Sequence, residues 1–253
     1  MVRSLSLSIA LLLVLRALAG PVETRLPSGA GLISEHFQAA GPPRAVLLWY
    51  SGQYGRIEAE QRAAADLAGL GFEVWLADWL APYFLPPTAS SLQQVPEEDL
   101  AAWLQAAVQA HPQRPVVLLA SGHAALLPLR AAAAWRARAQ APAQPAGAVL
   151  LFPILYQDPE PGEEPEYDPV VARTRLDLVL LFPQHSAGHW WRDALQAAFA
   201  AAGSRTRGAV LPSVRDRFHH RADANADEQQ AAARLGELLA AHILSLLDPE
   251  SVQ

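Results

Sequence analysis

RPVVLLASGHAALLPLR, residues 114–130, is the stretch that decides the fold of this chain. It opens with a continuous apolar run at 116–120, which is typical of a β-strand buried on both faces. The pair Ser121-Gly122 follows as a tight turn, and a helix is predicted directly after it, over 124–139. Pro128 falls in the first turns of that helix, where proline is tolerated better than in the interior. The stretch therefore predicts a strand–turn–helix unit.

The same alternation continues on both sides of this unit. Further apolar runs predict strands at 45–50, 72–77, 148–152, 176–182 and 206–211. Helices are predicted at 57–70, 96–110, 190–202 and 226–247. An edge-strand pair is expected within 20–43. Strands alternating with helices of this length predict an α/β fold with one doubly wound domain, in which helices cover both faces of a mostly parallel sheet.

Two of the helices carry more detailed expectations. In the helix at 57–70, Ala65, Leu67, Ala68 and Leu70 are predicted to face the core. The repeat of Asp223, Asn225 and Asp227 at alternate positions resembles the start of a calcium loop, but it lacks the glycine and the distal glutamate of such loops. We therefore interpret it as the start of the last helix.

Composition excludes several classes of function. The chain has 253 residues, of which 51% are hydrophobic, and a net charge of −6. These values suit a globular domain and disfavour nucleic acid as a partner. The absence of cysteine excludes disulfides, thiolate metal ligands and a cysteine nucleophile. No glycine-rich phosphate loop is present, which disfavours nucleotide binding.

Residues 1–19 have the pattern of a cleavable signal peptide. Arg3 precedes an apolar segment at 5–15, and Ala17-Leu18-Ala19 forms a small-residue cleavage site. The apolar segment is shorter than the roughly 20 residues that a membrane span needs. We expect a protein of the bacterial periplasm, or a secreted one, with its domain at 20–250 and no stable membrane span after cleavage. The alternative is an uncleaved anchor in the inner membrane.

The unit at 114–130 resembles the nucleophile elbow of the α/β-hydrolases, where the catalytic residue sits between small residues on a sharp strand-to-helix turn. LDLVLLFPQHS, residues 176–186, resembles the strand and turn that deliver the catalytic acid of this family. LPSVRDRFHHR, residues 211–221, resembles the histidine-bearing segment of its dienelactone-hydrolase-like members. The order and spacing of the motifs fit over about residues 44–246. The short acidic, proline-rich segment at 158–169 lies where the family often inserts a cap, so a minimal cap is expected.

The resemblance assigns the three catalytic positions to residues that lack the required groups. The nucleophile position falls on Gly122, the acid position near Ser186, and the histidine position on Asp216. The family's chemistry needs a nucleophile, an imidazole that takes its proton and a carboxylate that orients the imidazole. The loop after the first core strand reads Ser51-Gly52, where the family usually has His-Gly. This combination favours a non-catalytic binding or accessory protein, a pseudoenzyme.

A rearranged catalytic site is the alternative. Ser121 would then be the nucleophile and His219 or His220 the base of an esterase or a dienelactone-hydrolase-like enzyme. Leu119 and His123 would flank that nucleophile, and both are large for the close packing of an elbow.

Ligands of such sheets bind beyond the carboxyl ends of the strands. The predicted ligand-binding residues are Ser51, Tyr54, His123, His185, His189 and His219. Their imidazoles, with Asp216, leave open a metal-dependent activity, but they match no recognised ligand spacing, and we predict neither a metal nor another cofactor. Aromatic residues also gather near the strand ends: Trp49, Tyr50, Tyr54, Trp79, Tyr83, Phe84, Trp190 and Trp191. They either pack the core beneath the loops or form a wall for an apolar or sugar-like ligand or a partner's side chain.

Overall fold

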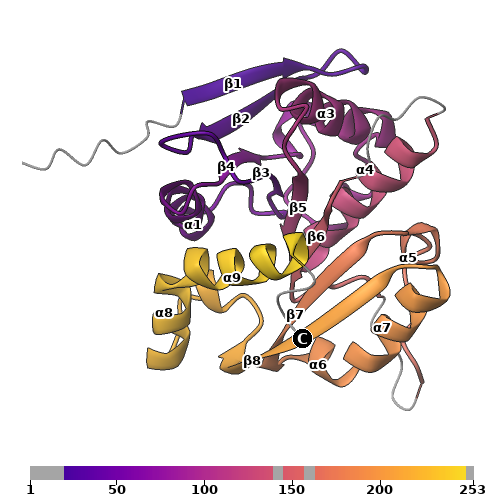
Figure 1. Ribbon diagram of the computed structural model, residues 1–253. Helices are drawn as coiled ribbons and strands as arrows, with labels where there is room; N and C mark the ends of the chain where they lie inside the picture. Colours follow the sequence, from indigo (N-terminus) through magenta and orange to yellow (C-terminus); the bar gives the residue numbers. More distant parts are fainter. Residues whose placement is uncertain (1–19, 139–144, 157–162, 249–253) are drawn as a thin grey trace, which may run out of the picture.

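The computed structural model describes residues 20–138, 145–156 and 163–248, which fold around an eight-stranded sheet (Figure 1). The strands are β1 (Gly20–Arg25), β2 (Gly31–Phe37), β3 (Val46–Tyr50), β4 (Glu73–Ala77), β5 (Val116–Ser121), β6 (Gly147–Leu151), β7 (Asp177–His185) and β8 (Arg205–Arg215). They lie in the order β1-β2-β4-β3-β5-β6-β7-β8. Only the pairs β1/β2 and β2/β4 among them are antiparallel, so the predicted mostly parallel sheet is confirmed.

Helices connect the parallel strands. The α-helices are α1 (Glu58–Gly69), α2 (Ala89–Leu92), α3 (Glu97–Ala110), α4 (Leu126–Arg136), α5 (Val170–Arg173), α6 (Ala187–Trp190), α7 (Arg192–Ala201), α8 (Ala226–Ala233) and α9 (Leu235–Leu247). Short 3-10 turns are η1 (Ala81–Tyr83), η2 (Gly122–Ala125) and η3 (Phe218–His220). Four predicted features lie wholly or partly outside the described residues. They are the signal peptide (1–19), the last residue of the helix predicted at 124–139, the first part of the acidic segment (158–162), and the end of the predicted domain (249–250).

The sheet is buried on both faces, which explains the continuous apolar runs of its central strands. Every residue of β3, β5 and β6 is buried. Alternate side chains of a strand point to opposite faces, so Leu48 packs with α3 and α4, whereas Leu47 packs with α1 and α9. Figure 1 shows these two helix pairs on opposite sides of the sheet. Each fully buried leucine contributes roughly 1.5–3 kcal/mol to folding.

The inward face of α1 differs from the prediction. Leu67 and Ala68 are buried as expected, but Ala65 and Leu70 are exposed. The buried face includes Ala59 and then follows the spacing i, i+3, i+4, i+7, i+8 from Glu60. The prediction was wrong about two residues because it left that acidic residue out of the apolar stripe.

The last predicted helix is two helices. Arg234, at φ −110° and ψ 17°, separates α8 from α9. At the start of α8, the Asn225 side chain accepts from the backbone of Glu228, and the Glu228 carboxylate accepts from the backbone of Asn225. The interpretation of this segment as a helix start is therefore confirmed.

β7 and β8 run further than predicted, to His185 and Arg215 instead of 182 and 211. The end of β8 is held by the buried carboxylate of Glu228, which pairs with the Arg215 guanidinium at 2.6 Å and accepts from its backbone N–H. Arg215 holds the pKa of Glu228 at about 2. This ion pair fixes the point from which the loop at 216–221 leaves the sheet.

No helix in the described part of the chain is long and apolar enough to span a membrane.

Candidate active site at the strand–turn–helix elbow

The turn between β5 and α4 is sharp because Gly122 adopts a left-handed backbone conformation, with φ 58°. L-residues with a side chain rarely adopt this conformation. A Cβ at this position would lie 3.0 Å from Cε2 of Phe152. Phe152 follows β6, is buried, and has a positive φ of 39°. The space next to the turn is thus taken by an aromatic ring.

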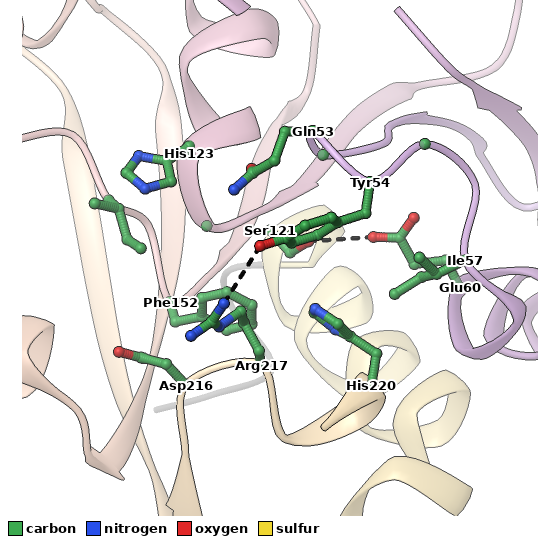
Figure 2. Close-up of a pocket in the computed structure, with 14 residues that line it drawn as sticks. Gln53, Tyr54, Ile57, Glu60, Ser121, His123, Phe152, Asp216, Arg217 and His220 are labelled. Atoms are coloured by element: carbon green, nitrogen blue, oxygen red, sulfur yellow. Dashed lines mark hydrogen bonds between the residues drawn. The ribbon is translucent and has the colours of Figure 1, made fainter. Parts of the chain in front are cut away.

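A cavity of about 200 Å³ opens at this turn (Figure 2). Its lining comes from the loop after β3, the start of α1, the elbow, the segment after β6 and the loop after β8. The lining residues are Gly52, Gln53, Tyr54, Gly55, Ile57, Glu60, Ser121, Gly122, His123, Phe152, Ile154, Asp216, Arg217 and His220. The cavity therefore lies at the carboxyl edge of the sheet, where α/β folds bind their ligands.

The structure brings the three assigned catalytic positions together. Asp216 lines the cavity that Gly122 also lines. Burial raises the pKa of Asp216, while the neighbouring Arg217 guanidinium and the Ser186 hydroxyl lower it. Ser186 also caps α6, because its hydroxyl accepts from the backbone of His189. Gly122 and Asp216 thus line one cavity, and Ser186 lies beside Asp216.

Comparison with solved structures gives the fold. A carboxyl esterase from Bacillus coagulans matches with a TM-score of 0.64 at 9% identity, over 90% of this chain and 98% of that one. A candidate dienelactone hydrolase from Klebsiella pneumoniae matches with a TM-score of 0.62 at 16% identity, over 89% and 98%. An esterase from Pyrobaculum calidifontis matches with a TM-score of 0.64 at 12% identity, over 89% and 85%. This chain has the α/β-hydrolase fold. No protein-family model and no curated protein matches its sequence.

Within this fold, the Ser121 hydroxyl forms a hydrogen bond with the carboxyl group of Glu60. The Ser121 backbone is extended, at φ −126°, and its side chain is 8% exposed. The hydroxyl donates its proton to Oε1 of Glu60 at 3.2 Å (Figure 2). A hydroxyl has a single proton to donate. In this arrangement the Ser121 hydroxyl proton is therefore not donated to an imidazole.

Glu60 is a buried acid in the wall of the cavity. Its side chain is 1% exposed, and Oε2 has no hydrogen-bond partner within the described part of the chain. Burial raises its pKa to about 8. The hydroxyls of Ser121 and Ser51 and the indole N–H of Trp49 act in the opposite direction, although only Ser121 completes a hydrogen bond of regular geometry. Near neutral pH the carboxyl is therefore mostly protonated.

The histidines divide into two groups. His123 and His220 line the cavity, and His219 lies behind His220, its Nε2 at 3.2 Å from Nδ1 of His220. His219 is buried against Phe152, and burial lowers its pKa to about 3. His185 is exposed at the end of β7, and His189 belongs to α6. Neither is a lining residue of the cavity.

The remaining predicted residues also fall in different places. Tyr54 lines the cavity and accepts a hydrogen bond from Arg217 at 3.5 Å. Ser51 is fully buried beside Glu60. Of the eight aromatic residues, Tyr50 and Trp79 stack within the core. Phe84 and Trp190 are exposed. In the described structure, Tyr54 is the one member of this group that lines the cavity. Residues 20–138, 145–156 and 163–248 contain no cluster of three or more side chains able to hold a metal ion.

Sequence reasoning missed Glu60 and Phe152. Glu60 had a usable signal, because it precedes Ala63, Ala64 and Leu67 at helical spacing on the buried face of α1. Phe152 had none, since its approach to Gly122 depends on the packing of β5 beside β6.

Gly122→Ala is expected to lower the free energy of unfolding by about 1–3 kcal/mol, because alanine is strained at this φ and its methyl group would meet Phe152. Urea denaturation measures the change. Gly69→Ala is the matched control: nothing lies within 4 Å of its Cβ and it sits in α1, so it should stabilise the protein by roughly 0.5–1 kcal/mol. An unchanged stability of Gly122→Ala would contradict the turn geometry.

Glu60→Gln is expected to become more stable relative to the wild type as the pH rises from about 5 to 8. The unfolded wild type releases the Glu60 proton near its ordinary pKa of 4.5, whereas the folded protein keeps it up to about 8. Rising pH therefore disfavours the folded wild type, by at most about 1.4 kcal/mol per pH unit in this window.

The measurement is urea denaturation of both proteins at pH 5, 6, 7 and 8. Glu58→Gln is the control, because Glu58 is an exposed carboxylate on the same helix, and its difference from the wild type should stay nearly constant. A constant difference for Glu60→Gln as well would mean that Glu60 is ionised in the folded protein across this range.

Proposed function

We propose that this protein binds a small ligand in the cavity at the elbow and performs no serine-hydrolase chemistry. The observation that carries the proposal is Gly122: the elbow position that presents the nucleophile of a hydrolase has no side chain, and the Phe152 ring lies where one would begin. The cavity remains open beside it. The protein thus keeps a place for a ligand without the group that would attack it.

The other two positions support the same proposal. An imidazole takes the proton of the nucleophile in a hydrolase, and a carboxylate orients that imidazole. At the position that the resemblance assigns to the imidazole, this chain has the carboxyl group of Asp216. The Ser186 hydroxyl donates to the Pro183 carbonyl and accepts from the backbone N–H of His189, which caps α6. The Ser186 hydroxyl thus stabilises the end of β7 and the start of α6, and neither residue offers an imidazole that could take a proton from a nucleophile.

An esterase that uses Ser121 is the second candidate. The structural neighbours named above as esterases favour it, as does the position of Ser121 in the wall of the cavity. Against it stand the hydrogen bond from Ser121 to Glu60 and the burial of His219, which lowers its pKa to about 3 and makes its imidazole a weak base for a serine proton.

A fluorophosphonate probe separates the two candidates. We expect no labelling of the purified protein, and hydrolysis of p-nitrophenyl butyrate by the wild type within about twofold of that by Ser121→Ala, because no activated nucleophile is present. An active esterase of the same fold serves as the positive control. Labelling of the wild type that disappears in Ser121→Ala would replace the binding proposal with the esterase.

We also propose that the protein is exported. The pattern at 1–19 supports this, with the alternative of an uncleaved anchor. Expressed with a C-terminal tag in a Gram-negative bacterium, the chain should appear in the periplasmic fraction with a mass that lacks residues 1–19. Ala19→Arg should block cleavage and leave the precursor at the membrane. Full-length wild-type protein in the cytoplasmic fraction would contradict export.

A further inference from the structure

A second cavity adjoins the cavity at the elbow. Its volume is about 680 Å³, within the range of small-molecule pockets, and its walls come from α2, α4, the segment after β6 and the segment that leads into α5. His123 and Ile154 line both cavities. Figure 2 shows His123 on the side of the elbow cavity away from Glu60 and His220. The two cavities are therefore neighbours, and one ligand can place an end in each.

The elbow cavity is the smaller and more apolar of the two. Its volume is about 200 Å³, and Ile57, Phe152 and Ile154 give it apolar walls. The charged Arg217 is exposed and donates to Tyr54, which is 55% exposed, so this pair lies toward solvent. The elbow cavity therefore suits a short apolar group.

The second cavity is lined by charges of both signs. Arg130 and Arg173 belong to its lining, and both donate to Oε1 of Glu97, at 3.1 and 2.7 Å. Glu166 and Asp168 add two carboxyl groups to the same lining. A ligand with a net charge would meet groups of its own sign there, because two guanidinium and two carboxyl groups share one cavity. The lining therefore favours an uncharged ligand.

Uncharged polar and aromatic side chains complete the second cavity. Ser90 and Gln93 are exposed lining residues, and Tyr156 and Tyr167 are paired by a β-bridge and add aromatic surface. A carboxylate only accepts hydrogen bonds and a guanidinium only donates them, whereas a ligand hydroxyl does both. An uncharged group that carries several hydroxyls can thus satisfy both kinds of side chain. Aromatic rings offer flat apolar surface to its C–H groups.

We propose that the two cavities together bind a neutral glycoside with a short apolar aglycone. The aglycone occupies the elbow cavity, the sugar occupies the second cavity, and the bond between them passes His123 and Ile154. This inference rests on the proposed binding function and names the class of its ligand. A free sugar would fill only the polar cavity, and an alcohol only the apolar one.

The test is isothermal titration calorimetry at pH 7 with hexyl β-D-glucopyranoside, its galactoside epimer, D-glucose and hexan-1-ol. The tighter of the two glycosides should bind at least about tenfold more tightly than glucose or hexan-1-ol, because its joined halves lose the freedom of one molecule instead of two. Hexyl phosphate and hexylammonium carry the same chain with a charged group. Both should bind more weakly than that glycoside.

Variants assign the two halves of the ligand. The double variant Gln93→Ala/Glu166→Ala should weaken the glycoside about tenfold and leave hexan-1-ol unchanged, because it removes polar groups of the second cavity only. Gln94→Ala/Glu164→Ala is the matched control, since both residues are exposed neighbours outside the lining, and it should change neither affinity.

Gly52→Leu is the converse variant. Gly52 lines the elbow cavity, and nothing lies within 4 Å of a Cβ placed on it, so the leucine should extend into open space and reduce the room for the aglycone. Hexan-1-ol and the glycoside should both weaken about tenfold.

Circular dichroism establishes that each variant is folded, and the ranking of the probes on the wild type needs no variant. Glycosides that bind no more tightly than hexan-1-ol overturn the inference, as does tighter binding of hexyl phosphate or hexylammonium. Unchanged glycoside binding by folded Gln93→Ala/Glu166→Ala also overturns it. In each of these cases, binding of hexan-1-ol that Gly52→Leu weakens would leave the proposed function standing. Fluorophosphonate labelling of Ser121 would instead overturn the proposed function, whatever the ranking of the probes.

Discussion

The left-handed backbone of Gly122 is the constraint on which the site depends. It lets β5 reverse into η2 and α4 within one residue, so the carboxyl end of the central strand opens at the surface of the sheet. Phe152 closes against that residue from β6, and His219 packs against Phe152 in turn. A catalytic elbow uses the same turn to present a reactive group. In this chain the residue at the turn is Gly122, and the Phe152 ring lies beside it.

The second constraint is the anchoring of the loop after β8. The partly exposed Arg215 pairs with the buried carboxylate of Glu228, which also accepts from the backbone N–H of Asn225 at the start of α8. Asp216, Arg217 and His220 leave the sheet from this point and form one side of the cavity. The shape of that side therefore depends on a charged contact that lies outside the cavity itself.

Sequence patterns predicted the fold well because parallel strands buried on both faces leave an unambiguous signal in runs such as 116–120 and 45–50. They also gave the elbow, where strand, turn and helix follow each other directly. They did not give the break at Arg234, since the apolar pattern continues across it into α9. In the site, His123 and Tyr54 were named because they follow strand ends. Glu60 was not, because an acidic residue on a helix is normally assigned to the solvent side.

The contact between Gly122 and Phe152 also bears on how such a protein changes over time. A serine placed at 122 would meet the aromatic ring, because a Cβ there would lie 3.0 Å from Cε2 of Phe152. Positions 122 and 152 are therefore coupled in evolution, because a side chain at 122 needs a smaller residue or a displaced ring at 152.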